Sequence, residues 1–132
     1  MAVQGTFNSA LSKAVGLLEA SFVVHVVGTI VGAVLLLVGL GKGSLRNISD
    51  APWYSYLGGL LGVAIVLLVA LAIGRVGVAS ATTAIIVGQV TTAVIIDLLG
   101  WFGTERVPFS SLKFIGIVLM AGGAWLLLYR PK

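Results

Sequence analysis

The stretch FVVHVVGTIVGAVLLLVGL, residues 22–40, decides the fold of this 132-residue chain. His25 is its only ionisable side chain, and nearly all the other residues are apolar or glycine. A helix of this length rises about 28 Å, close to the roughly 30 Å thickness of a bilayer's hydrocarbon core. The stretch therefore predicts a helix that crosses a membrane.

The composition of the whole chain favours the same class. Hydrophobic residues make up 59% of the sequence and charged residues 9%. A typical soluble domain is about 45–50% apolar and about 25% charged. The 18 glycines suit close packing of helices in lipid. The sequence thus predicts an all-α integral membrane protein whose surroundings are the lipid bilayer.

Several classes of protein are excluded by what the sequence lacks. It has no cysteine, one histidine and four acidic residues, which argues against disulfides, thiolate chemistry and metal centres. No cofactor is expected. It has no Walker loop, nucleophile elbow or HExxH motif, so no catalytic residue is assigned and an enzyme is not expected. The net charge of +4 comes without a basic patch interleaved with aromatics, so no nucleic-acid partner is expected.

Apolar runs and their lengths predict five helices in a single transmembrane domain, residues 1–132. The expected helices are about 1–18, 22–40, 56–73, 81–98 and 114–129. The first is more polar than the others because it contains Gln4, Asn8 and Lys13. Four spans with an interfacial first helix are therefore the alternative.

Positive charge is balanced across the expected membrane. With five spans, the Lys and Arg residues on one side are Lys42, Arg46, Arg106 and Lys113, and those on the other are Lys13, Arg75, Arg130 and Lys132. Orientation follows the Lys/Arg bias of short loops, and here there is none. We therefore expect dual topology, with oppositely inserted copies pairing as an antiparallel homodimer, an inverted repeat. The alternative is one orientation set by a subtler feature, such as Lys13 inside the membrane.

Two pairs of glycines are spaced as GxxxG, namely Gly28 with Gly32 and Gly58 with Gly62. This spacing places both glycines of a pair on one helix face, where a second backbone can approach closely. We expect helix packing at these faces, mainly within the chain. The alternative is packing between two copies.

Polar side chains in the first two helices are candidates for a substrate pathway. Gln4 and Asn8 lie one turn apart on one face. Amides buried in lipid need partners, so the pair either lines a polar path or ties the first helix to its neighbours. His25, one turn into the second helix, is either a satisfied interface residue or a titratable group on the path.

Further candidates lie in the fourth helix and before the third. Gln89 and Thr92 share one stripe, and Asp97 lies off it near the helix end. A carboxylate at the membrane centre costs about 2.5–3.5 kcal/mol and less near an interface. Asp97 is therefore expected near the headgroups as a gate, cation contact or proton-coupled group; the alternative is a salt bridge. Trp53 is a candidate mouth aromatic that could stack on a cationic substrate.

Short pieces of sequence recur in a recognisable order along nearly the whole chain. They are residues 4–8 with Leu11; Phe22 with residues 27–29; Pro52 and Trp53 with residues 57–59 and Gly62; Gly88 and Gln89 with Asp97 and Gly100; and Gly116 with Gly122. In this order the chain resembles the YdcZ-type inner-membrane exporters of bacteria, in the drug/metabolite transporter superfamily.

The resemblance implies a five-helix unit that occurs singly, in pairs or in fused chains, the paired form being an inverted repeat. Such proteins usually carry more apolar residues ahead of residues 4–8, so the first helix is expected to be short or the chain trimmed there. We expect a multi-pass protein of the bacterial inner membrane. It would transport or export a small molecule by alternating access at a dimer interface. The alternatives are a small dual-topology ion channel and a non-transporting membrane scaffold.

Overall fold

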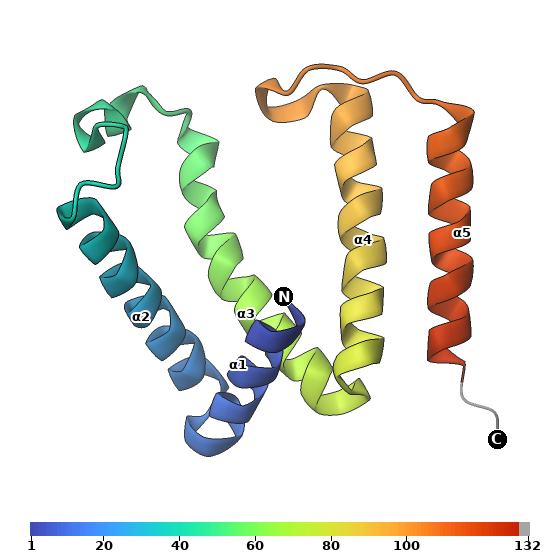
Figure 1. The fold of residues 1–132 in the computed structure, drawn as a ribbon, viewed down its shortest axis with the longest axis horizontal. Coiled ribbons are helices and arrows are strands. Elements are labelled where there is room, and N and C mark those ends of the chain that lie inside the picture. Colours follow the sequence, from blue (N-terminus) through green and yellow to red (C-terminus); the bar gives the residue numbers. More distant parts are fainter. Residues whose placement is uncertain (130–132) are drawn as a thin grey trace. The chain divides into compact units, whose positions relative to one another are not determined.

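A computed structural model of the protein describes residues 1–129, which fold into helices with no strand among them (Figure 1). The α-helices are α1 (Ala2–Val15), α2 (Leu17–Leu37), α3 (Leu57–Val76), α4 (Val78–Leu99) and α5 (Ser111–Leu128). Three 3₁₀ helices lie in the loops: η1 (Leu45–Asp50), η2 (Trp53–Tyr56) and η3 (Trp101–Gly103). The all-helical prediction is confirmed. Arg130 and Lys132, which enter the charge balance, lie outside the described residues.

Four of the helical segments are long and apolar enough to cross a membrane. They are Leu17–Leu37, Trp53–Val76, Val78–Leu99 and Ser111–Leu128, with mean hydropathies of 1.8 to 2.7. Helix α1 has 14 residues and spans about 21 Å, which is short of a bilayer core. Five spans are therefore not confirmed, and the described residues form four spanning-length helices preceded by a short one.

Single glycines set two of the boundaries that hydropathy misplaces. Gly16 has φ 101° and separates α1 from α2, so α2 begins at Leu17 and not near residue 22. Gly77 has φ 87° and separates α3 from α4 in the same way. Positive φ is strained for residues with a Cβ, so one glycine suffices to break a helix there. Helix α2 starts directly after Gly16, so the polar residues Glu19 and Ser21 fall inside it.

Contacts divide the chain into two compact units, one of Met1 with Val3–Arg75 and the other of Ala2 with Val76–Lys132. In the first unit α1 packs on the C-terminal half of α3. A Cβ built at Gly5 would lie 2.6 Å from Ile73 Cδ1 and 2.9 Å from Val69 Cγ1. One built at Gly74 would lie 3.7 Å from Ser9 Oγ. The two helices thus approach closely where α1 has no side chain.

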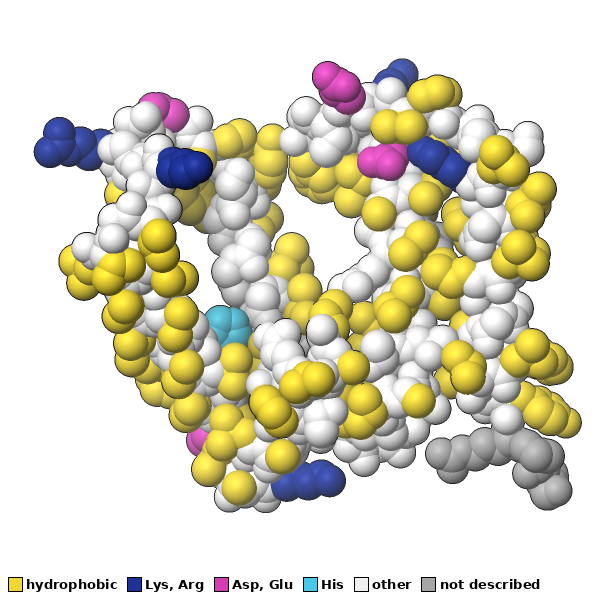
Figure 2. Space-filling model, in the orientation of Figure 1, with side chains coloured by type: hydrophobic (Ala, Val, Ile, Leu, Met, Phe, Trp, Pro, Cys, Tyr) yellow, Lys and Arg dark blue, Asp and Glu magenta, His cyan; other side chains and the backbone are white. Residues whose placement is uncertain are grey.

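In the second unit α4 packs along α5, and η3 contacts α4 (Figure 1). The large apolar side chains of the protein are mostly exposed. Figure 2 shows hydrophobic side chains along the helices and charged side chains at their ends. An exposed apolar surface on this scale fits contact with lipid tails.

Candidate substrate pathway

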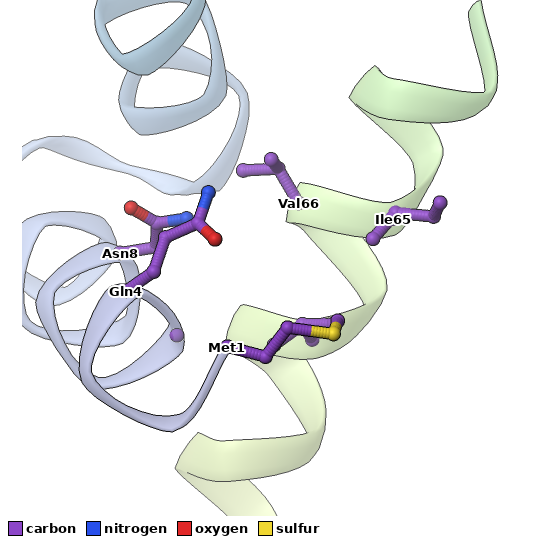
Figure 3. A pocket seen from close by; sticks show the side chains of 7 residues that line it. Met1, Gln4, Asn8, Ile65 and Val66 are labelled. Carbon is purple, nitrogen blue, oxygen red and sulfur yellow. The ribbon is translucent and has the colours of Figure 1, made fainter. Parts of the chain in front are cut away.

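A small pocket lies between α1 and α3 in the first unit (Figure 3). Its volume is about 20 Å³. Its lining residues are Met1, Gln4, Gly5, Asn8, Ile65, Val66 and Val69. The α3 side is wholly apolar, so the only side-chain amides of the lining come from α1. The sequence placed these two amides on one helix face, and the structure brings both to this pocket.

The surroundings of the two amides differ. Asn8 is buried, with 7% of its surface exposed, whereas Gln4 is exposed at the pocket's edge. Figure 3 shows both side chains projecting from α1 towards α3, with Val66 opposite them. The pocket has room for about one water molecule, which amide groups can hydrogen-bond.

The pocket lies beside the middle of α3, which belongs to one of the spanning-length segments. The α3 residues that line it are Ile65, Val66 and Val69, and α3 runs from Leu57 to Val76. Helix α1 therefore reaches only to the middle of α3, because Met1 lines the same pocket. The amides of Gln4 and Asn8 therefore form a polar site beside the middle of an apolar helix.

His25 lies on α2 in the same unit, with one ring nitrogen bound and the other facing α3. Its Nδ1 lies 2.7 Å from the carbonyl oxygen of Ser21. A Cβ built at Gly62 would lie 3.5 Å from its Nε2. The ring therefore meets α3 where α3 has no side chain. The hydroxyl of Thr29 in turn donates to the His25 carbonyl over 2.8 Å.

A second pocket surrounds His25, between α2 and α3. It has a volume of about 200 Å³ and is lined by Leu18, Ser21, Phe22, His25 and Val63. Ser21 is 2% exposed, and its Oγ has no hydrogen-bond partner among the described residues. Gln4, Asn8 and His25 thus lie in one unit but in two pockets.

The α4 candidates belong to the second unit. Thr92 is exposed, and its hydroxyl donates to the Gly88 carbonyl over 2.8 Å. Gln89 is exposed as well. The pathway role of Gln89 and Thr92 stays a prediction.

Asp97 lies near the C-terminal end of α4, where the following loop folds back on the helix. Its carbonyl accepts from Val107 N over 3.0 Å, and Arg106 Nε donates to the Leu99 carbonyl over 3.3 Å. These bonds satisfy carbonyls that a helix end leaves free. Asp97 is half-buried. Its predicted roles stay predictions.

Trp53 begins η2, just ahead of α3, and is 75% exposed. Its ring meets Tyr54 edge to face, with centroids 6.2 Å apart. It is thus available at the end of a spanning segment. Its predicted role as a mouth aromatic stays a prediction.

The GxxxG glycines differ in what they face within the chain. A Cβ at Gly28, Gly32 or Gly58 would meet nothing within 4 Å, whereas one at Gly62 would meet His25. The predicted role of these glycines in helix packing stays a prediction.

Three residues that the sequence analysis did not single out occupy important places. Gly5 and Ser9 make the close contact of α1 with α3, and Ser21 is the buried hydroxyl beside His25. The spacing of residues in the sequence contained a signal for each of these three. Gly5 and Ser9 are small residues four apart, the small-xxx-small pattern of close helix contacts. Ser21 and His25 are also four apart and share a helix face.

Within residues 1–129, no group of three His, Cys, Asp or Glu side chains could hold a metal ion. No residue set for a cofactor is apparent in the described part of the chain either. The only ionisable side chain among the described residues that line these two pockets is that of His25.

Spanning-length apolar helices with polar groups in pockets between them define a multi-pass integral membrane protein. The chain belongs to the family described as "Putative inner membrane exporter, YdcZ", whose family model matches residues 1–126. The resemblance drawn from the sequence is thereby confirmed. No curated protein and no solved structure matches the chain. The protein is therefore an inner-membrane member of an exporter family.

Proposed function

We propose that the protein is a secondary transporter of the drug/metabolite type that exports a small molecule by alternating access, as an antiparallel homodimer. The observation that carries the proposal is the pair of amides, Gln4 and Asn8, in the pocket at the middle of α3. Polar groups at membrane depth are costly and usually functional. Binding sites near the midplane are the rule in transporters built from inverted repeats.

The size of the α1–α3 pocket supports a moving part. At about 20 Å³ it admits about one water and no organic substrate. A substrate can reach both amides only when α1 moves on α3. At Gly5 the contact between α1 and α3 involves no side chain of α1, which lets one backbone shift past the other. Alternating access would then open and close this contact.

Pairing of two copies is supported by open glycine faces and by the charge balance. A Cβ built at Gly28, Gly32 or Gly58 would meet nothing within 4 Å among the described residues, so a second copy can approach there. Equal numbers of Lys and Arg on the two sides favour insertion both ways up. Two opposite copies would form an inverted repeat.

Flux through proteoliposomes tests the proposal. Radiolabelled tetraethylammonium, glycine and glycerol serve as cationic, zwitterionic and neutral probes, each with and without a pH gradient. A transporter is expected to give slow, saturable flux of at least one probe that responds to the gradient. Fast, non-saturating flux would instead support a channel. Flux no greater than through protein-free liposomes, for all three probes, would support a scaffold.

Dual topology predicts labelling from both sides at a single site. Gly43→Cys places a thiol in the exposed loop between α2 and α3, in a chain with no other cysteine. An impermeant maleimide added to intact cells is expected to label about half of the Gly43→Cys protein, and the rest only after permeabilisation. Thr104→Cys, in the loop between α4 and α5, should give the same fractions. Complete labelling, or none, in intact cells would rule out dual topology.

A further inference from the structure

The structure assigns a second binding subsite, the pocket between α2 and α3. We propose that it takes a small apolar molecule carrying one hydrogen-bond donor, which binds the acceptor nitrogen Nε2 of His25. The inference rests on the proposed function, which it deepens by naming a ligand class. It is carried by the hydrogen bond of His25, the bare face of α3 and the chemistry of the pocket lining.

The hydrogen bond to Ser21 fixes which ring nitrogen is free. A carbonyl oxygen can only accept, so Nδ1 of His25, 2.7 Å from Ser21 O, carries a proton and donates. In the neutral ring Nε2 is then the acceptor. A ligand donor can therefore bind only the lone pair of Nε2.

The neighbouring helix leaves this nitrogen uncovered. Nε2 faces Gly62, where a Cβ would come within 3.5 Å. Any larger side chain at that position would cover the lone pair. His25 also lines the pocket of about 200 Å³. The acceptor is thus placed beside a cavity and not against a partner side chain.

The lining defines the rest of the ligand. Leu18, Phe22 and Val63 supply an apolar wall. A volume of about 200 Å³ has room for one ring, and the pocket is open on one side, since Leu18 and Phe22 are 68% and 70% exposed. The Ser21 hydroxyl, buried and without a partner, is a second polar group in the lining. A ring with a single O–H or N–H group matches one acceptor in an apolar pocket.

No other charged group lines the pocket in the described residues. On α2, Glu19 turns towards Gly16 and is outside the lining. On α1, the nearest cation in sequence is Lys13, which is exposed. On α3 the only charged residue is Arg75, near the far end from Gly62. Within residues 1–129, the lining therefore holds no counter-ion for a charged ligand.

Phenol and toluene are matched probes, because they share a ring and differ by O–H against methyl. Their binding to purified protein in detergent is measured by equilibrium dialysis against protein-free micelles. At about pH 8, changing His25→Leu is expected to lower the ratio of phenol to toluene affinity about fivefold, the factor for one ordinary hydrogen bond.

The variant His25→Gln is the rescue. Its side-chain oxygen can accept a hydrogen bond from phenol, so the ratio of phenol to toluene affinity should stay high. Ser21→Ala removes a hydroxyl that has no hydrogen-bond partner among the described residues, so the melting temperature should not fall. This measurement checks that the fold around the pocket stays intact. Equal ratios of phenol to toluene affinity in the wild type and His25→Leu would overturn the subsite. The pocket would then be one that a lipid acyl chain fills.

The outcomes also separate this inference from the proposed function. Binding in detergent requires no transport, so an intact His25 effect without any flux would uphold the subsite and count against transport. Saturable flux with unchanged phenol selectivity in His25→Leu would uphold transport and overturn the subsite.

Discussion

Replacing Gly5 by leucine is expected to release α1 from α3 and to destabilise the folded protein by about 1–3 kcal/mol or more, the usual cost of overpacking. Even a Cβ at this position would come within 2.6 Å of Ile73 and 2.9 Å of Val69. Ile73 is itself buried, so it has little room to move. Gly5→Ala should give a smaller loss. Hydrogen exchange of the α1 amides in detergent measures the release, because local opening exposes them.

A matched control is available on α5. A Cβ at Gly116 would meet nothing within 4 Å, so Gly116→Leu and Gly116→Ala add the same atoms without a clash. Both should leave exchange in α1 unchanged, and alanine can strengthen its helix by up to about 1 kcal/mol. Unchanged exchange in Gly5→Leu would show that α1 does not depend on this contact.

Replacing Asn8 by leucine is expected to reduce saturable flux about five- to twelvefold while leaving the protein folded. Loss of one hydrogen bond of about 1–1.5 kcal/mol to the substrate in the transport cycle corresponds to roughly that factor. Leucine is close to asparagine in size and suits the apolar α3 side of the pocket. The flux is that of whichever probe among tetraethylammonium, glycine and glycerol shows saturable transport in the wild type.

Ser9→Ala is the control for this change. Ser9 is also buried on α1, but its hydroxyl lies near Gly74 and outside the pocket. It should therefore retain flux. If Asn8→Leu instead keeps flux but speeds hydrogen exchange in α1, the amide ties α1 to α3 and does not touch the substrate. That result would support the structural alternative for Gln4 and Asn8.

Most of the fold could be predicted from the sequence because lipid leaves few choices. Runs near 20 apolar residues must be helices in a bilayer, since every backbone group needs an internal partner. That rule located α2 to α5. It missed their ends, because Gly16 and Gly77 stop helices through backbone conformation and not through hydropathy. It also overestimated the first helix, which stops at Val15 before Gly16.

The candidate site was only partly predictable for a related reason. The spacing of Gln4 and Asn8 put both on one face of α1, and the structure places both in one pocket. Their partner on α3 could not be predicted, since α3 is apolar on every side and no face stands out. A search for polar side chains likewise does not find the contact at Gly5, because glycine has no side chain. Pairing of two copies stays a prediction, because it depends on a second chain.

The contact between Gly5 and Ile73 also bears on how the protein is inserted. Ile73 is synthesised about 68 residues after Gly5. At roughly 5–20 residues per second, the delay is about 3 to 14 s. Throughout that interval α1 has no α3 to pack on, so its polar face must rest among headgroups or against the insertion machinery. Helix α1 is thus synthesised before α3 but can dock only once α3 is there to receive its amides.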